Sequence, residues 1–293
     1  MSSADGADAL LFREETAARE ALLRVADGAA AAFAAPRPGA ERSQDAVLVL
    51  PLDPDRAVMA VADGMGGLPD GGLASARAIG ALAEAVETAV AAGQSLQSAI
   101  LDGIARANDA VLDLASGAAT TLAVAELCGG TVRAYNIGDS EVMVLGQRGR
   151  LRLRTVSHSP VGFAVQAGLV DHETALHHED RHLVSNFLGS REMRIEVGSS
   201  LRLAPLDTVL LCTDGLVDNL RLAEIREILR CGPLDEGLRR LARRAQARMS
   251  GASASDGQQH PSKPDDISLV AFRSRPGRAV ARRLPPPRQF SLA

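Results

Sequence analysis

Apolar positions along the chain form short strand-like runs and longer stretches with helical spacing. The strand-like runs cover residues 45–50, 57–62, 120–127, 131–137, 141–145, 151–156, 207–213 and 267–272. Apolar residues recur every three or four positions over 73–90, 96–114, 222–231 and 235–249, which predicts four helices in two consecutive pairs. Strands separated by helix pairs predict an α+β fold with mainly antiparallel sheets.

The ends of the chain differ from its middle in composition. Residues 1–35 are polar at first and then rich in alanine, which leaves a helix and a weak first strand both open. Pro36 to Gly39 breaks the chain, so we expect an N-terminal extension over 1–35 and a folded domain over 36–273. The Arg- and Pro-rich residues 274–293 are expected to be a disordered tail, and the Gly/Ser-rich residues 250–264 a mobile loop.

Composition and charge exclude several classes of protein. Hydrophobic residues make up 46% of the chain and aromatic residues 2%, so the core must be built from aliphatic side chains. The net charge is −4, and the basic and acidic residues are well mixed along the chain, which argues against binding to nucleic acid or to a membrane surface. No apolar run reaches about 18 residues, the length of a membrane span. The absence of a basic leader and the three cysteines without CxxC spacing favour a cytoplasmic protein, which we expect to be a monomer.

Four aspartates stand where a strand begins or ends. Asp63 follows the run 57–62 and is succeeded at once by Gly64, while Asp45 opens the preceding run. If these two runs pair as an antiparallel hairpin, Asp45 and Asp63 share one edge of the sheet. Asp214 follows the run 207–213, and Asp265 precedes the last run.

Carboxylates gathered without basic partners repel one another unless a cation lies between them. Oxygen ligands suit Mg²⁺ or Mn²⁺, and the absence of an adjacent set of histidines or cysteines argues against zinc. Two such ions can activate a shared water and polarise a phosphoryl group. The residues therefore predict metal-assisted hydrolysis of a phosphate ester.

Four motifs resemble those of bacterial PPM/PP2C-type metal-dependent serine/threonine protein phosphatases. They are Asp63-Gly-Met-Gly-Gly67 with Gly71 and Ala74-Ser75, Asn136-Ile-Gly-Asp139-Ser140, Cys212-Thr-Asp-Gly-Leu216, and Asp265-Asp-Ile-Ser268. They occur in the family's order, and the similarity covers roughly residues 36–273. The resemblance implies an α-β-β-α sandwich, two mainly antiparallel sheets flanked by helix pairs.

The resemblance also assigns roles to individual residues. Asp63 would bridge two Mn²⁺ or Mg²⁺ ions, the Gly64 carbonyl would help to bind one of them, and Asp214 and Asp265 would complete the other site. Asp45 would lie near the metals or their waters, and Asp218 matches one acid of a third metal site. The attacking group would be a water or hydroxide that bridges the metals, so no side chain is expected to act as the nucleophile. Ser140 is accordingly expected to be a turn hydroxyl beside the site.

Several positions depart from the family's pattern. An acidic position before Asp45 is Gln44, and the third-metal acid of a D-H-S segment is Ser157. The phosphate-binding basic position falls on Ala40, so Arg42 or Arg37 would have to replace it. His178 and His182 have the spacing of a metal pair, but the resemblance places them in a flap region, where flap structure or substrate contact is expected.

The leading hypothesis is a phosphoserine/phosphothreonine phosphatase whose substrates are phosphoproteins, among them those of a Hanks-type kinase. One alternative is a catalytically weak pseudophosphatase that binds phosphoproteins as a regulator, for which Gln44, Ala40 and Ser157 speak. Another is a metal-dependent hydrolase of small phosphate esters.

Overall fold

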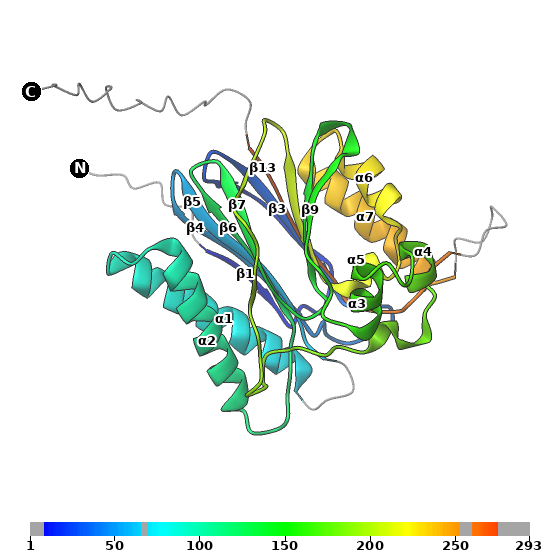
Figure 1. The fold of residues 1–293 in the computed structure, drawn as a ribbon, viewed down its shortest axis with the longest axis horizontal. Helices are drawn as coiled ribbons and strands as arrows, with labels where there is room; N and C mark the ends of the chain where they lie inside the picture. Colours follow the sequence, from blue (N-terminus) through cyan, green and yellow to red (C-terminus); the bar gives the residue numbers. More distant parts are fainter. Residues whose placement is uncertain (1–8, 66–69, 252–259, 275–293) are drawn as a thin grey trace, which may run out of the picture.

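Two antiparallel sheets lie face to face, with helices on both outer sides (Figure 1). The computed structural model describes residues 9–65, 70–251 and 260–274. Helices α1 and α2 cover one sheet, and α6 and α7 cover the other. The expected α+β sandwich is thereby confirmed.

The first sheet carries both strands of the hairpin predicted around Asp45 and Asp63. Its strands, in spatial order, are β1 (Leu10–Arg13), β4 (Asp45–Asp53), β5 (Arg56–Asp63), β6 (Leu122–Cys128), β7 (Thr131–Ile137) and β10 (Glu196–Val197), with β11 (Leu201–Arg202) also paired to β7. Strands β4 and β5 are antiparallel neighbours, and Asp45 stands directly opposite Asp63. The hairpin prediction is confirmed.

The second sheet joins the two ends of the folded chain. Its strands, in spatial order, are β2 (Arg19–Val25), β3 (Gly28–Ala35), β13 (Ile267–Ser274), β12 (Thr208–Cys212), β8 (Glu141–Leu145) and β9 (Leu151–Arg154). Strand β13 lies between β3 and β12, so the last described strand is held on both edges.

The helices form the outer layers and the flap. They are α1 (Gly71–Ala91), α2 (Leu96–Leu112), α3 (Pro160–Gln166), α4 (His172–Ala175), α5 (Asp214–Val217), α6 (Leu222–Leu229) and α7 (Leu234–Met249), with 3₁₀ turns η1 (Gln147–Gly149) and η2 (Glu179–His182). The Ser95 hydroxyl caps α2 by accepting a hydrogen bond from the Ser98 N–H at 3.2 Å. We call residues 157–189, which contain α3, α4 and η2, the flap.

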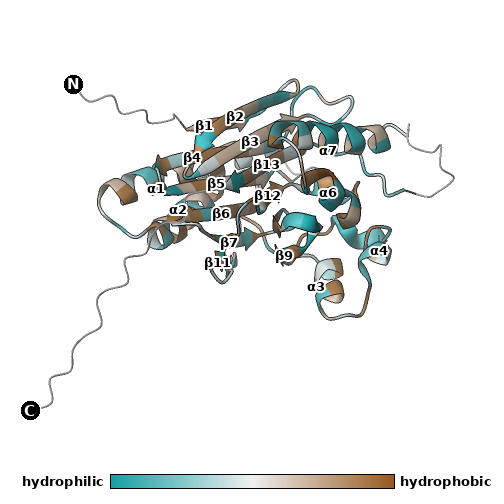
Figure 2. Ribbon diagram, turned by 90° about the horizontal axis from the view of Figure 1, so that it is seen from above, coloured by the Kyte–Doolittle hydropathy of each residue, from teal (hydrophilic) through white to brown (hydrophobic). Residues whose placement is uncertain are grey.

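Side chains along each strand point alternately to the two faces of its sheet, and this alternation produces three apolar layers. On β4, Val47 and Val49 pack between the sheets, whereas Leu48 and Leu50 pack against α1 and α2. The third layer lies between the second sheet and helices α5 to α7. Figure 2 shows the result: the strands are largely hydrophobic (brown), whereas helix α7 carries both hydrophilic (teal) and hydrophobic (brown) residues.

The domain boundary expected at residue 36 is wrong, because three strands precede it. Strand β3 is paired on both edges, and Ala30, Ala32 and Ala34 are buried between the sheets. Alanine is a poor strand former by propensity, but its small side chain suits a strand covered on both faces, so burial overrides propensity here. The folded unit therefore includes residues from Leu10 onward.

The mobile loop expected over 250–264 is wrong at its C-terminal end. The side-chain carbonyl of Asn219 accepts a hydrogen bond from the Lys263 N–H at 2.9 Å, and the Ser262 hydroxyl donates to the Arg248 carbonyl at 3.0 Å. Polar composition suggested a solvated loop, but these polar groups bind to the turn after α5 and to helix α7 instead. Residues 252–259 and the tail from 275 lie outside the described residues. Within the described ranges, no helix is both long and apolar enough to cross a membrane.

Packing around β3 leads to a stability prediction. Ala32→Leu should lower the free energy of unfolding by about 1–3 kcal/mol, because the space between the sheets has no room for three more carbons. Urea unfolding followed by circular dichroism measures this. Arg24→Leu, on the exposed face of the neighbouring strand β2, is the matched control and should change stability by less than about 0.5 kcal/mol. Equal effects of the two substitutions would contradict the central position of β3.

Candidate active site

A tight approach of two glycines sets the position of the Asp45 and Asp63 pair. Immediately after Asp63, the Gly64 N–H donates to the Gln44 carbonyl at 3.1 Å, which closes the end of the hairpin. A Cβ atom at Gly64 would collide with the carbonyl of Gly71, at the start of α1. Glycine is therefore required here so that the helix can begin against the carboxylates. Gly66 and Gly67 lie outside the described residues.

The second sheet brings two further acids to the same end of the sandwich. Strand β12 ends at Cys212 and α5 begins at Asp214, while β13 begins two residues after Asp265. A Cβ atom at Gly215 would collide with the Asp266 carbonyl, so the two segments touch through their backbones. Asp45, Asp63, Asp214 and Asp265 are consequently close enough to influence one another electrostatically.

Burial and like charge raise the pKa values of these carboxyls. The pKa of Asp45 and that of Asp63 are both raised well above the usual value, first by burial and then by neighbouring aspartates. Burial and the Asp214 charge raise the pKa of Asp218 to about 7 and that of Asp265 to about 6. Asp139 belongs to one of the sequence motifs but was not predicted to be a site residue. Its pKa is raised in the same way, by burial and then by the charges of Asp214 and Asp218.

Hydrogen bonds hold the cluster without neutralising it. The Thr213 hydroxyl donates to Asp45 Oδ2 at 2.8 Å, and Asp266 accepts the N–H groups of Arg37 at 2.7 Å and Gln44 at 2.6 Å. Asp266 thus ties the segment before β4 to the start of β13. The Ser140 hydroxyl is fully buried and lies 2.7 Å from that of Thr121, as befits a structural hydroxyl.

The donor set fits a divalent cation. Asp45 Oδ1 and Asp214 Oδ1 are buried and have no hydrogen-bond partner, so each leaves an oxygen available to a metal. Within the residues that the structure describes, no three histidine, cysteine, aspartate or glutamate side chains are arranged to hold an ion as they stand. Mg²⁺ and Mn²⁺ prefer oxygen donors with negative charge, which these carboxylates supply. Asp214, Asp218 and Asp265, however, already have a basic side chain as a partner.

That partner is Lys263, which the sequence analysis missed. Its Nζ forms an ion pair with Asp214 Oδ2 and lies 3.0 Å from Asp265 Oδ2 and 3.2 Å from Asp218 Oδ2. Burial lowers the pKa of Lys263, but the three carboxylates outweigh it and leave that pKa raised, so the amine is an ammonium. The sequence held one sign of this contact: Lys263 stands only two residues before Asp265, and a basic side chain is unexpected so close to a predicted metal ligand.

The predicted phosphate-binding arginine lies apart from the cluster. Arg42 is mostly exposed, and its Nη1 lies 3.7 Å from Glu14 Oε1. Ser157 has its hydroxyl 2.9 Å from that of Ser159, at the entrance to α3. The imidazoles of His178 and His182 make local bonds: His178 Nδ1 accepts from the Asp180 N–H at 3.1 Å, and His182 Nδ1 lies 2.8 Å from the Glu179 carbonyl oxygen.

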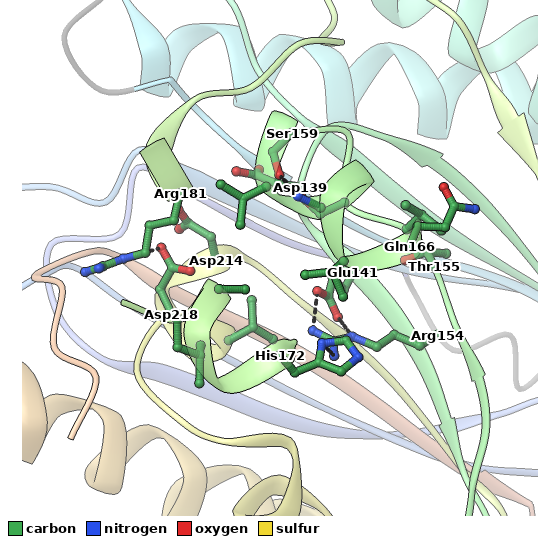
Figure 3. Close-up of a pocket in the computed structure, with 18 of the residues that line it drawn as sticks. Asp139, Glu141, Arg154, Thr155, Ser159, Gln166, His172, Arg181, Asp214 and Asp218 are labelled. Atoms are coloured by element: carbon green, nitrogen blue, oxygen red, sulfur yellow. Dashed lines mark hydrogen bonds and ion pairs between the residues drawn. The ribbon is translucent and has the colours of Figure 1, made fainter. Parts of the chain in front are cut away.

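A cavity of about 320 Å³ opens beside the acids, between the second sheet and the flap (Figure 3). Asp139, Asp214, Asp218 and Arg181 lie toward one end of it, and Arg154 with His172 toward the other. Apolar side chains complete the wall: Leu151, Val156, Val161, Val165, Leu176 and Val217. Figure 3 also shows Glu141 paired with Arg154, at 2.7 and 2.8 Å, so this arginine is already neutralised. A molecule that enters the cavity meets carboxylates at the end nearest the cluster.

Sequence comparison connects this arrangement to known proteins. A sequence model described as protein phosphatase 2C matches residues 37–254. The serine/threonine phosphatase stp of Listeria welshimeri is 31% identical over 186 residues, which cover 60% of the chain and 73% of stp. The serine/threonine protein phosphatase PstP of Mycobacterium tuberculosis is 33% identical over 193 residues, which cover 63% of the chain and 36% of PstP.

Solved structures show the same fold. MsPP, a PPM Ser-Thr phosphatase from Mycobacterium smegmatis solved with cacodylate, superposes with a TM-score of 0.67 at 27% identity, covering 83% of the chain and 97% of MsPP. The catalytic domain of PstP, solved with two manganese ions, superposes with a TM-score of 0.66 at 24% identity, covering 87% and 97% of the two chains.

Repulsion within the cluster predicts an unusual effect of removing a charge. Asp63→Asn should raise the free energy of unfolding of the metal-free protein by about 1–3 kcal/mol at pH 8. The folded-state pKa of Asp63 is raised, so ionisation favours the unfolded chain. The gain should therefore shrink as the pH falls toward the unfolded value of 3.8, where the carboxyl is protonated in both states.

Urea unfolding in EDTA at pH 8 and pH 5 measures this difference. The control is Asp53→Asn, which removes a carboxylate bonded to Arg56 at 2.6 Å and should lower stability slightly, by less than about 1 kcal/mol. If Asp63→Asn lowered stability at pH 8 by as much as its control, the carboxylates would not be repelling one another.

Proposed function

Because the chain belongs to the protein phosphatase 2C family of serine/threonine phosphatases, we propose that it hydrolyses phosphoserine and phosphothreonine in proteins with two Mn²⁺ or Mg²⁺ ions. The observation that supports this most directly is the gathering of Asp45, Asp63, Asp214 and Asp265 at one end of the sandwich. Carboxylates with raised pKa values and free oxygens are costly to fold unless cations bind there.

The proposed ligands come from both sheets. Asp63 and the Gly64 carbonyl, with Asp45 beside them, would hold metal at the end of the first sheet, and Asp214 and Asp265 at the end of the second. Asp218 is the candidate for a third ion. When bound, the ions would make a water more acidic and draw negative charge from the phosphoryl oxygens.

The chain's own groups would position the reactants. Thr213 holds one oxygen of Asp45 by a hydrogen bond and leaves the other free, which orients this carboxylate. The cavity wall formed by Val161, Val165 and Leu176 would exclude water from the residues that flank the phosphorylated side chain. No side chain is proposed as the nucleophile, and buried Ser140 is already bonded to Thr121. Arg42 is a weak candidate for phosphate binding because it is exposed.

One observation favours the alternative of a pseudophosphatase. The Lys263 ammonium already neutralises part of the cluster, as a chain that binds no metal would require. Gln44, Ala40 and Ser157 point the same way. A pseudophosphatase would still bind phosphoproteins, among them those phosphorylated by a Hanks-type kinase, but would not hydrolyse them.

Turnover assays separate these functions. The purified chain should hydrolyse a phosphothreonine peptide in Mn²⁺ and not in EDTA. Asp63→Asn and Asp214→Asn should each reduce kcat by more than the roughly 10–100-fold that loss of an outer-shell partner costs. Asp109→Asn, an exposed carboxylate on α2, is the matched control and should leave kcat unchanged.

Each hypothesis has its own outcome. Turnover of p-nitrophenyl phosphate without turnover of the phosphopeptide would indicate a small-ester hydrolase. Binding of the phosphopeptide by folded protein without turnover, in either metal, would refute the proposed activity in favour of the pseudophosphatase.

A further inference from the structure

Lys263 stands among three proposed metal-site carboxylates. Its ammonium lies 3.0 Å from Asp265 and 3.2 Å from Asp218 and is bonded to Asp214, while its side chain is only 22% exposed. The ammonium thus faces three acids in the part of the site contributed by α5 and the segment before β13, where Arg181 Nε also lies 3.8 Å from Asp218 Oδ2. We call these three acids the Lys263 half of the cluster. The opposite half, with Asp45 and Asp63, belongs to the first sheet.

Lys263 is the only lysine in the chain. All of the other basic residues counted among the 32 lysines and arginines are arginine. Arginine has a broad, planar fork, whereas the lysine ammonium is a compact point charge that can take a position the size of an ion. The one lysine in an otherwise arginine-only chain therefore lies where a small cation is needed.

The backbone of Lys263 is fixed independently of its charge. The Asn219 side chain both accepts from the Lys263 N–H at 2.9 Å and donates to the Lys263 carbonyl at 2.8 Å. Asn219 is fully buried and donates also to the Gly215 carbonyl at 3.0 Å, which places it on the turn that carries Asp214. Arg248, buried in α7, binds the Asn219 carbonyl at 2.5 Å. The lysine side chain is thus aimed at the acids from a rigid base.

We infer that Lys263 is an internal cation that neutralises the Asp214, Asp218 and Asp265 carboxylates in the metal-free protein and competes with a divalent ion for them. This inference rests on the proposed metal centre and deepens it. An ion entering the Lys263 half must separate the ammonium from its carboxylates, whereas an ion at Asp45 and Asp63 displaces no charged side chain that the structure pairs with them. The two halves should therefore load at different metal concentrations, the Lys263 half last.

Metal binding to the whole chain tests the competition. Lys263→Gln should tighten the weaker class of Mn²⁺ sites by about tenfold or more, measured by calorimetry and by the electron paramagnetic resonance of free Mn²⁺. Lys263→Arg, which keeps the charge, is the matched control and should not tighten them. In EDTA, Lys263→Gln should also unfold at a lower temperature than the unaltered chain, and saturating Mn²⁺ should reduce this difference.

A measurement on the unaltered chain guards against a variant that fails to fold. Lysine labelled with ¹³C at Cε gives a single signal, because the chain has one lysine. Titration with diamagnetic Mg²⁺ should move this signal to the position of a solvent-exposed lysine, and the move should follow occupancy of the weaker site. The Asp109→Asn control should titrate in the same way.

The outcomes separate this inference from the proposed function. If Lys263→Gln binds Mn²⁺ as the unaltered chain does, or the ¹³C signal stays in place at saturating Mg²⁺, the internal cation is refuted while the metal centre stands. If neither chain binds metal, both are refuted. Tighter binding in Lys263→Gln together with a moving signal establishes the competition.

Discussion

Repulsion among carboxylates at one end of the sandwich is the constraint on which the site depends. Burial takes these groups away from water, and each then raises the pKa of its neighbours. Hydrogen bonds from Thr213 and from backbone N–H groups to Asp45 and Asp266 hold the acids in place, but cannot cancel their charge. Only a cation can cancel it: the Lys263 ammonium lies among three of the carboxylates, and the unpartnered oxygens of Asp45 and Asp214 are donors of the kind that the proposed divalent ions would use.

Each of the two sheets contributes part of the carboxylate cluster. The first contributes Asp45 and Asp63 from a single hairpin whose register places them opposite one another. The second contributes Asp214 just after β12 and Asp265 just before the neighbouring β13, and Gly215 allows the backbones of these two segments to touch. Because the sheets are packed through an apolar layer, small shifts between them would alter the distance between the halves of the cluster. The precision of the site therefore depends on the packing of residues far from it.

Much of the fold could be predicted because pattern and local chemistry agreed. The hairpin of Asp45 and Asp63 followed from two apolar runs with a polar turn, and α2 from helical spacing with Ser95 in front of it. Strand β3 could be named from the sequence only as one of two possibilities, a helix or a weak first strand, because its alanines owe their conformation to burial on both faces and carry no clear local strand signal. Lys263 was not predicted for a similar reason: its segment looks like a solvated linker, and only the tertiary contact with Asn219 directs it to the acids. The roles assigned to the metal ligands remain proposals.

The pairing of β3 with β13 has a consequence for folding of the chain during its synthesis on the ribosome. These strands are neighbours along eight residue pairs, yet Ala35 and Ile267 are separated by most of the chain. A contact between such distant segments closes late, because the intervening chain must be ordered first. An emerging polypeptide carries Asp45, Asp63 and Asp214 long before it carries Lys263 and Asp265. A nascent chain that has not yet reached residue 263, or a chain cut before it, therefore cannot assemble the whole cluster, and the site can close only after strand β13 has been made.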